Sequence, residues 1–353
     1  MTPPTSRPVV GIALSGRIRE DYLGAADLER LGRLAEVRVE EFEVPSGWGP
    51  VEADEDSRRR LAGFAAGCDL LVVCHGSPPV DEDVLAAAPR LRFVGELEGD
   101  RFAGRIDVEA AREHDVVAVD TTHSSSWPVA EWALALALLG LRQHGLFRRV
   151  MADEELRKDR DEVPPVRELS GRPVGMIGFG HIGWRLRELL RPFGGPVLVH
   201  DPFAPRELAD ALDVDFAPLE RVMGCDVVVC LVPATPSTEG MIGADELERL
   251  QPGAVFVNVS RGAVVDTDAL VRRAARGDAW FGLDVHDPEP VPVGAPLRHL
   301  PNVLLSPHIA GVTEEARPRF FTVMVDEIER FLTGREPRAQ LTDAVMAGRG
   351  RPG

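Results

Sequence analysis

Positive charge, cysteine and long apolar runs are all scarce in this sequence. Of its 353 residues, 40 are Lys or Arg and 57 are Asp or Glu, which gives a formal net charge of −17, and Lys158 is its one lysine. A surface with this charge repels nucleic acid and anionic membranes, so neither is an expected partner. The excess of acid is interpreted as an aid to solubility.

Membrane and disulfide signals are missing as well. No stretch reaches the roughly 18 uninterrupted apolar residues of a membrane span, and residues 1–8 contain no apolar core of signal-peptide length. We therefore expect a cytoplasmic protein. The cysteines form no Cys-x-x-Cys pair and lie in or beside apolar runs, at Cys68, Cys74, Cys225 and Cys230. This spacing suggests neither a disulfide framework nor a zinc site, and no metal is expected.

Short apolar runs alternate with amphipathic stretches, a pattern that predicts βαβ units, parallel sheets and hence an α/β fold. A chain of this length exceeds what one hydrophobic core usually organises, so we expect two domains. Strands in the first part are expected at 9–14, 70–74, 91–94 and 116–119, and helices around 28–34 and 84–88. Six more strands, as in a doubly wound dinucleotide domain, are expected at 174–177, 197–200, 227–232, 255–259, 281–285 and 303–306.

Three further segments have distinctive compositions. A helix is expected at 129–141, where Pro128 suits a helix start and alanines and leucines cover nearly every face. Such a helix has to be buried, at a domain or subunit boundary. Residues 151–167 are charged, contain two adjacent prolines and are expected to form a connecting loop. The last helix is expected near 319–332, and the Arg-, Gly- and Pro-rich tail after Gly334 is expected to be a frayed end.

A G-x-G-x-x-G run lies between the expected strand at 174–177 and a stretch with helical spacing. Gly178 permits the tight turn, Gly180 lets the backbone approach a pyrophosphate, and Gly183 lets helix and strand pack closely. The alternative is an ordinary glycine turn, which the agreement of strand, spacing and helix disfavours. The sequence therefore predicts a dinucleotide site.

The residues around this loop indicate which dinucleotide binds. The amides of His181 and Ile182 open the expected helix and are placed to meet phosphate, whereas the His181 side chain could face the phosphate or simply be exposed. Asp201, eighteen residues after Gly183, ends the next strand, where a carboxylate can accept hydrogen bonds from the adenosine ribose hydroxyls. Asp201 would repel a 2′-phosphate, so the sequence predicts NAD rather than NADP.

Three polar residues follow predicted strands at one edge of the second sheet, where ligands bind in open α/β sheets. Hydride transfer at a carbinol carbon requires proton transfer at its oxygen by a group that titrates near neutrality, and His308 is the candidate. Glu289 would favour the imidazolium form of such a histidine, and Arg261 can hold a substrate carboxylate through its planar fork. Taken singly, each residue could instead be structural. Asp284 could hold the nicotinamide carboxamide or cap the following turn.

The chain resembles the D-2-hydroxyacid dehydrogenases, the group that includes phosphoglycerate dehydrogenase and hydroxypyruvate reductase. The resemblance covers most of the chain and is strongest from 129 to 311. Its motifs are Val129-Ala130-Glu131, Gly178 to Gly183, Val232-Pro233-Ala234-Thr235-Pro236-Ser237-Thr238, Val257-Asn258-Val259-Ser260-Arg261-Gly262, Leu283-Asp284-Val285, Glu289-Pro290 and Ser306-Pro307-His308-Ile309.

The resemblance implies that Arg261, Glu289 and His308 are the catalytic residues. It implies further cofactor contacts at Pro233, Thr238, Val259, Asp284 and Gly311. It also implies a Rossmann-type doubly wound NAD domain at 127–311 and a flavodoxin-like parallel α/β substrate domain made of 1–126 and 312–353. A homodimer built through the NAD domains would bury the apolar helix at 129–141.

The sequence departs from the family on the substrate side. The family's glycine-rich G-x-G-x-D run aligns with 100–104, where a carboxylate and a phenylalanine replace two glycines. The family's Arg-Ser pair becomes His75-Gly76, so a phosphorylated substrate loses an anchor. We expect a small carboxylate substrate to contact His75, Gly76, Asp100 and Arg101. No long segment follows residue 340, so the regulatory domain of some phosphoglycerate dehydrogenases is expected to be absent.

Together these patterns predict an NAD-dependent oxidoreductase that interconverts a D-2-hydroxy acid and its 2-keto acid, with His308 as general acid and base. The alternative is an NAD-sensing binding protein of the corepressor type, which the altered stretch 100–104 favours and the retained catalytic trio disfavours. Formate enzymes of the resembled family have glutamine at the position of Glu289, which argues against formate oxidation. Phosphite oxidation on the same scaffold stays open.

Overall fold

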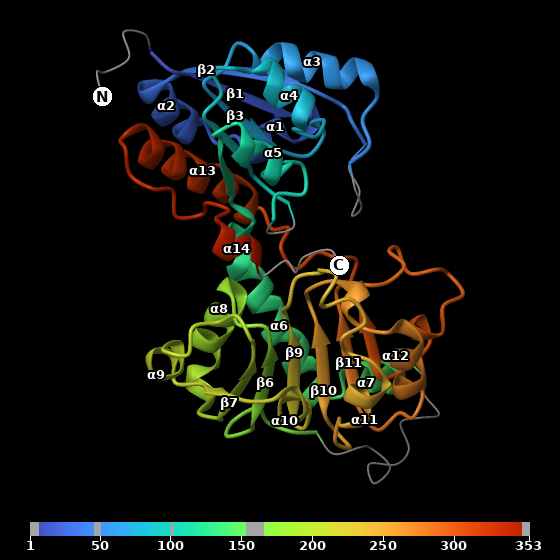
Figure 1. Cartoon of the computed structure of the whole chain (residues 1–353). Coiled ribbons are helices and arrows are strands. Elements are labelled where there is room, and N and C mark those ends of the chain that lie inside the picture. The colour runs from blue at the N-terminus through green and yellow to red at the C-terminus, as the bar shows by residue number, and fades with distance from the viewer. Residues whose placement is uncertain (1–6, 46–50, 100–101, 153–165, 348–353) are drawn as a thin grey trace. The chain divides into compact units, whose positions relative to one another are not determined.

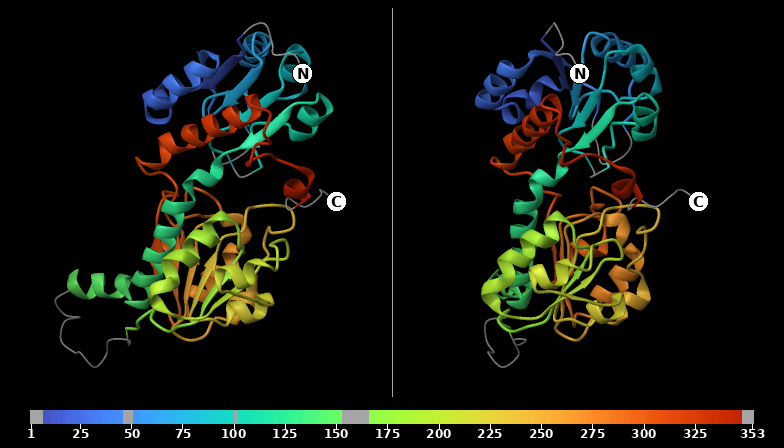
Figure 2. Two further views of the ribbon diagram at one scale, coloured as in Figure 1. Left: turned by 90° about the vertical axis from the view of Figure 1, so that its left-hand side faces the viewer. Right: turned by 60° about the vertical axis from the view of Figure 1, so that its left-hand side comes forward.

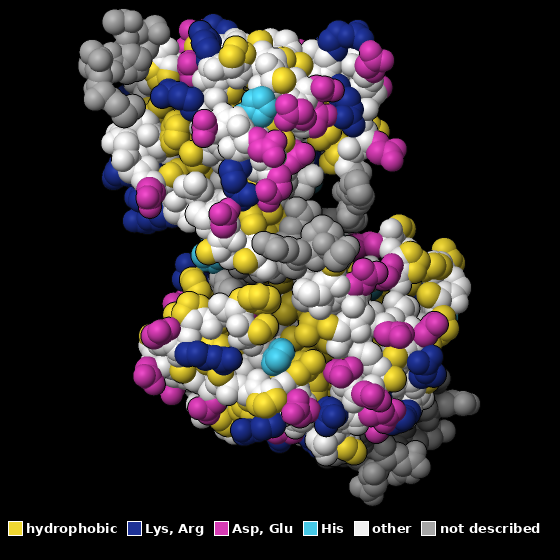
Figure 3. All heavy atoms as spheres, viewed as in Figure 1, with side chains coloured by type: hydrophobic (Ala, Val, Ile, Leu, Met, Phe, Trp, Pro, Cys, Tyr) yellow, Lys and Arg dark blue, Asp and Glu magenta, His cyan; other side chains and the backbone are white. Residues whose placement is uncertain are grey.

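The computed structural model describes residues 7–45, 51–99, 102–152 and 166–347. The chain divides into two compact units, the first made of Met1–Ser125 with Val312–Arg349 and the second of Ser126–Gly311 (Figure 1). No helix within the described ranges is long and apolar enough to cross a membrane. On the face drawn in Figure 3, acidic side chains are spread over both units.

Unit 1 contains one parallel sheet of five strands in the order β2-β1-β3-β4-β5. The strands are β1 (Val9–Leu14), β2 (Glu36–Glu41), β3 (Leu70–Val73), β4 (Phe93–Glu96) and β5 (Val117–Asp120). The helices are α1 (Arg19–Tyr22), α2 (Ala25–Leu34), α3 (Glu55–Ala65), α4 (Glu82–Ala87), α5 (Val108–Glu113), α13 (Ala316–Leu332) and α14 (Asp343–Ala347). An order of 2-1-3-4-5 is that of flavodoxin, so the predicted flavodoxin-like architecture is confirmed.

Both faces of this sheet are covered by helices because the strands are apolar on both sides. Val10 and Ile12 of β1 belong to the core cluster that includes residues of α2 and α13. Ala13, on the opposite face of β1, belongs to the cluster formed with α3, α4 and α5. The views of Figures 1 and 2 show α13, from the end of the chain, beside α2 on one side of the sheet.

Unit 1 differs from the sequence analysis in one strand that was not predicted and in one expectation that was wrong. Strand β2, which the sequence did not predict, is an edge strand rich in glutamate that pairs in parallel with β1. The tail after Gly334 is not frayed over its described part. The backbone N–H of Leu341 donates to the Ala118 carbonyl at 2.9 Å, and the Leu341 side chain is buried. The buried carboxylate of Glu327 accepts hydrogen bonds from two further backbone amides of this tail.

Unit 2 contains one parallel sheet of seven strands in the order β12-β11-β10-β9-β6-β7-β8. The strands are β6 (Val174–Ile177), β7 (Val197–His200), β8 (Asp215–Phe216), β9 (Val227–Cys230), β10 (Val255–Asn258), β11 (Trp280–Leu283) and β12 (Val303–Leu305). The helices are α6 (Ser126–Leu141), α7 (His144–Ala152), α8 (His181–Leu190), α9 (Leu208–Leu212), α10 (Leu219–Met223), α11 (Ala244–Glu248) and α12 (Thr267–Ala274). With the edge strand β12 left out, the remaining six strands, numbered along the chain from β6, follow the Rossmann order 3-2-1-4-5-6, which confirms the predicted doubly wound sheet.

The apolar helix of unit 2 packs on this sheet. Helix α6 begins at Ser126, so Pro128 lies in its first turn. Gly140 lies so close to the Trp280 ring that any side chain there would overlap it. Four larger apolar side chains of α6, namely Trp132, Leu134, Leu138 and Leu139, are only half-buried. Helix α7 already ends at Ala152, and residues 153–165 of the predicted connecting loop lie outside the described residues.

Candidate active site

The glycine loop has the geometry that a dinucleotide site requires. Gly178 follows β6 with φ +92°, a conformation that favours glycine, and a Cβ there would lie 2.9 Å from the Val232 side chain. At Gly183, a Cβ would lie 3.0 Å from the Phe179 ring, so helix and loop pack closely. Helix α8 is capped by Gly180 without a side-chain hydrogen bond. These residues fit a bound NAD, because a pyrophosphate can approach the first amides of α8.

The two residues that open α8 differ in their surroundings. His181 is exposed, and its ring centroid lies 5.0 Å from that of Trp184. The Ile182 side chain packs against the apolar core of unit 2. The Ile182 side chain is therefore partly covered by the core, whereas the His181 side chain is at the surface.

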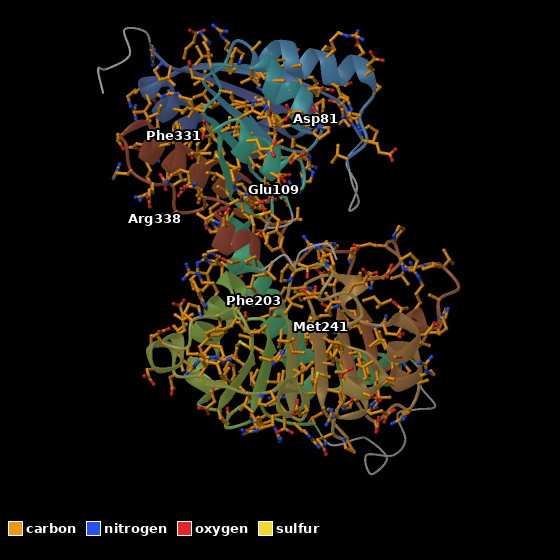
Figure 4. The ribbon with its side chains drawn as sticks, in the orientation of Figure 1. Asp81, Glu109, Phe203, Met241, Phe331 and Arg338 are labelled. Carbon is orange, nitrogen blue, oxygen red and sulfur yellow. The ribbon has the colours of Figure 1, made fainter. Side chains whose placement is uncertain are left out.

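Asp201 ties the segment after β7 to the glycine loop. Its Oδ2 accepts the backbone N–H of Phe179 at 2.7 Å, and its Oδ1 accepts those of Phe203 at 2.8 Å and Ala204 at 3.0 Å. Phe203 itself is exposed (Figure 4). The predicted ribose-binding carboxylate thus has a second task in shaping the loop, which the sequence did not reveal.

The loop after β9 contains the two residues predicted for the adenine side. The hydroxyl of Thr238 donates to the Pro233 carbonyl at 2.6 Å and accepts the Thr235 N–H at 2.8 Å. Pro233 and Thr238 are therefore brought together, with the hydroxyl of Thr238 closing the loop. Val259 is buried directly after β10, and Gly311 is the last residue of the unit's continuous segment.

His308 and Glu289 are in direct contact. His308 Nδ1 lies 2.9 Å from Glu289 Oε1, and their side chains are 11% and 17% exposed. Burial raises the pKa of Glu289 above its usual value, and the positive charge of Arg261 acts in the opposite direction. Arg261 follows β10 and donates from Nη1 to the Ser260 carbonyl at 2.8 Å. The structure thus joins two of the three predicted catalytic side chains, with Arg261 acting electrostatically on Glu289.

Asp284 organises the turn that carries His308. The Asp284 side chain is fully buried, and its carboxylate accepts the hydroxyl of Ser306 at 2.5 Å and the backbone N–H groups of Ile309 at 3.1 Å and Ala310 at 2.9 Å. Its carbonyl oxygen accepts the His308 N–H at 2.8 Å. These bonds hold His308 at φ +55°, which a non-glycine residue rarely adopts. Asp284 was expected either to hold the nicotinamide carboxamide or to cap the following turn. The described contacts are those of a turn cap.

Gly262 separates the loops that carry Arg261 and Glu289. A Cβ at Gly262 would overlap the backbone carbonyl of His286, because the two loops touch through their main chains. Thr267 adds a hydrogen bond from its hydroxyl to the Asp287 carbonyl at 2.8 Å. The sequence motif contained this glycine, but only the structure shows what it contacts.

The substrate-side residues of unit 1 form a polar cluster. Gly76 has φ +89°, and a Cβ there would lie 2.5 Å from that of Ser15. His75 Nδ1 accepts a hydrogen bond from Arg105 Nη2 at 2.8 Å, and its Nε2 lies 3.5 Å from Glu98. Asp100 and Arg101 lie outside the described residues.

The cluster includes residues that the sequence did not point to. Arg105 donates to Glu96 at 2.6 Å, and this pair is 5% and 0% exposed. Burial raises the pKa of Glu96 to about 8. Tyr22 donates its hydroxyl to Glu98. Glu96 and Glu98 lie just after a strand that the sequence predicts, and this position is a signal that could have identified them. No sequence pattern singled out Arg105.

Comparison with known proteins gives consistent matches. The family model described as D-isomer specific 2-hydroxyacid dehydrogenase, NAD binding domain, matches residues 134–310. A glyoxylate reductase of Korarchaeum cryptofilum is 34% identical over 298 residues, covering 82% of this chain and 87% of that protein. A D-3-phosphoglycerate dehydrogenase of Mycobacterium tuberculosis H37Rv is 32% identical over 354 residues, covering 98% of this chain and 60% of that protein. The crystal structure of the TT0316 protein from Thermus thermophilus matches with a TM-score of 0.71 and 29% identity, covering 94% of this chain and 100% of that one.

These matches favour an enzyme over an NAD-sensing binding protein, since the relatives are a reductase and a dehydrogenase. They also confirm NAD as the cofactor, as the glycine loop and Asp201 predicted. The chain belongs to the D-isomer specific 2-hydroxyacid dehydrogenases and is an NAD-dependent oxidoreductase that interconverts 2-hydroxy acids and 2-keto acids.

Proposed function

We propose that His308 is the general acid and base of this enzyme. In this proposal Glu289 orients His308 and favours its imidazolium form, and Arg261 binds the substrate carboxylate. The observation that carries the proposal is the 2.9 Å contact between His308 Nδ1 and Glu289 Oε1. With Nδ1 engaged by the carboxylate, proton exchange with the substrate oxygen falls to Nε2. The neighbouring carboxylate stabilises the imidazolium that forms when the alcohol loses its proton.

When held at the glycine loop Gly178 to Gly183, NAD would supply the hydride acceptor for oxidation of the hydroxy acid at its carbinol carbon. As that C–H bond breaks, the hydroxyl proton passes to His308 and the carbonyl double bond forms. In the reverse direction His308 returns the proton to the oxygen of the keto acid. Arg261 offers a planar fork to the carboxylate next to the reacting carbon, which fixes the orientation of the substrate.

Alanine variants at two positions test these roles. His308→Ala should lower kcat/KM for a 2-keto acid by about a hundredfold or more, because removing an acid–base group typically costs about 10²–10⁴-fold. Arg261→Ala should lower it by a similar amount, because two hydrogen bonds between charged groups are lost, at about 1.5–3 kcal/mol each. The Kd for NADH, measured by titration calorimetry, should change by less than about threefold. The matched controls are His144→Ala and Arg249→Ala, at exposed positions of unit 2. Turnover near the wild-type rate in both catalytic variants would refute the assignment.

We further propose that unit 2 is the NAD-binding domain and that unit 1 carries the substrate-specific contacts of a small carboxylate, His75, Gly76, Asp100 and Arg101 among them. A panel of small, aromatic and phosphorylated 2-keto acids, assayed with NADH, would define the substrate. If Gly76→Ala changes the order of activities across that panel while the Kd for NADH is unchanged, the assignment of the substrate-specific contacts to unit 1 is supported. An unchanged ranking would count against it.

A cytoplasmic homodimer built through unit 2 is also proposed. The half-buried apolar side chains of α6 support it, because a helix that is apolar on nearly every side needs a partner surface. Leu134→Glu with Leu138→Glu should convert the dimer to a monomer in light scattering coupled to size exclusion. Val293→Glu, at a side chain that is 86% exposed, offers a control of the same chemistry. A wild-type monomer at micromolar concentration would refute the dimer.

A further inference from the structure

A cavity of about 380 Å³ lies at the carboxyl ends of β7 and β8 in unit 2. Its wall includes Asp201, which the sequence assigned to the adenosine ribose, and also His200, Arg206 and Phe216. The sequence predicted a preference for NAD over NADP from the negative charge of Asp201, with no obligatory cation at its neighbours His200 and Pro202. The other wall residues change the charge balance of this cavity.

The carboxylate of Asp201 is largely engaged by the protein itself. A carboxylate can accept about four hydrogen bonds, and three backbone N–H groups, those of Phe179, Phe203 and Ala204, already donate to this one. Such donors stabilise and partly offset its negative charge. Asp201 therefore repels a phosphate less than an unengaged carboxylate would.

Arg206 supplies a cation at the same wall. Its guanidinium carbon lies 4.4 Å from the centroid of the Phe216 ring, so the side chain rests on an aromatic face. Phe216 in turn packs edge-on against Phe179 of the glycine loop, with ring centroids 6.1 Å apart. Across the described part of the chain, no salt bridge involves Arg206.

His200 adds a polar group beside Arg206. Its Nδ1 lies 3.3 Å from the Ala217 carbonyl, which can only accept, so Nδ1 is the donor in this contact. The cavity thus combines a guanidinium, an imidazole and a carboxylate that is already hydrogen-bonded on both oxygens.

We propose that Arg206 is a cofactor-specificity residue and that this cavity accepts an adenosine with a 2′-phosphate, so that the enzyme binds NADP(H) as well as NAD(H). A guanidinium held on an aromatic ring is pre-organised to bind phosphate through several N–H groups. The proposal rests on the assignment of the glycine loop as the dinucleotide site.

Calorimetric titration of the full chain with NADH and with NADPH, without substrate, tests the proposal independently of turnover. In the wild type the two Kd values should agree within about tenfold. Arg206→Ala should weaken NADPH binding by roughly 10- to 100-fold, the usual worth of a hydrogen bond to a charged group, and NADH binding by less than about threefold. Arg249→Ala, an equal loss of charge at an exposed position outside the cavity, should change neither value.

Fragment binding separates the phosphate from the nicotinamide. Adenosine 2′,5′-bisphosphate should bind the wild type at least as tightly as AMP, and only the bisphosphate should lose affinity in Arg206→Ala or at raised salt. NADPH binding more than about tenfold weaker than NADH binding in the wild type would overturn the proposal, as would an equal loss of both cofactors in Arg206→Ala. If neither cofactor binds, the assignment of the glycine loop as the dinucleotide site is wrong. This outcome is distinct from a failure of the Arg206 proposal alone.

Discussion

The carboxylate of Asp284 and the hydroxyl of Ser306 lie 2.5 Å apart, buried in unit 2. The same hydroxyl accepts the indole N–H of Trp132, in helix α6, at 3.1 Å. A chain of hydrogen bonds therefore runs from α6 through Ser306 to the carboxylate that caps the His308 turn. Through this chain a fully buried aspartate can influence catalysis, because it holds the His308 turn without contacting the substrate.

Replacing Ser306 tests this chain. Ser306→Ala leaves the Trp132 N–H without an acceptor and removes one donor to Asp284, which should lower the free energy of unfolding by about 1–3 kcal/mol. We also expect a lower kcat, with the Kd for NADH unchanged, because the His308 turn loosens. Denaturant titration and steady-state kinetics measure the two effects, and Ser170→Ala at an exposed site is the control. Wild-type kcat in Ser306→Ala would show that the turn is held without this bond.

Gly262 offers a steric test of the spacing between the two catalytic loops. Gly262→Ala places a methyl group against the His286 carbonyl, so the Arg261 and Glu289 loops have to move apart. We expect kcat/KM to fall by roughly a hundredfold or more, as positioning errors near about 1 Å do. Gly294→Ala, which meets open space, should be silent in the same assay.

The raised pKa of Glu289 predicts an acid limb in the rate profile. Below that pKa the carboxyl group is protonated and stabilises the imidazolium form of His308 less well. In the wild type, kcat/KM should fall as the pH drops through a value above 4.5, the usual pKa of this carboxyl group. Glu289→Gln should remove this limb and lower the plateau. An identical acid limb in both proteins would assign it to another group.

Glu96 predicts a pH dependence of stability. Its pKa is about 8 in the folded chain and near 4.5 in the unfolded one, since burial disfavours its charged form. Its contribution to stability is therefore fully present below about pH 4.5 and is lost as the pH rises through about 8. Relative to the wild type, Glu96→Gln should gain stability across this range in denaturant titrations. A difference that stays constant with pH would contradict the raised pKa.

The loop-shaping role of Asp201 predicts a loss of affinity for both cofactors. Asp201→Ala removes the acceptor of the Phe179 N–H and of two further amides, so the glycine loop loses a support. Both NADH and NADPH should bind at least about tenfold more weakly, the worth of one hydrogen bond to a charged group. Asp210→Ala, at an exposed site on α9, serves as the control. Unchanged NADPH affinity would mean that the loop keeps its shape without Asp201.

The sequence predicted the strands that have continuous apolar runs and missed the two strands that lack them. Strands β1, β6 and β7 were predicted to the residue, because their apolar runs are bounded by clear turn signals. Strand β2 escaped because an exposed edge tolerates alternating glutamate, and β8 because it has only two residues. Neither carries the continuous apolar signal of a buried parallel strand.

Some contacts of the candidate site could be predicted from the sequence and others could not. The contact of His308 with Glu289 was predictable, because neighbouring parallel strands end at one edge of the sheet. The hydrogen-bond partners of Asp201 and Thr238 could not be predicted, because they are backbone groups whose directions depend on the conformation of the loop. Arg105 escaped for a further reason, since its partner His75 lies thirty residues away on another strand end.

Helix α13 has a consequence for the order of synthesis. Its buried residues Phe320, Phe321 and Met324 belong to the core cluster of one face of the unit 1 sheet, yet the ribosome makes them after the whole of Ser126–Gly311. Residues 1–125 therefore emerge with that face uncovered, and they remain so while nearly two hundred further residues are translated. Unit 2, whose core is continuous in sequence, can therefore complete that core before unit 1 can, and the uncovered apolar face of nascent unit 1 is the surface exposed to aggregation in the meantime.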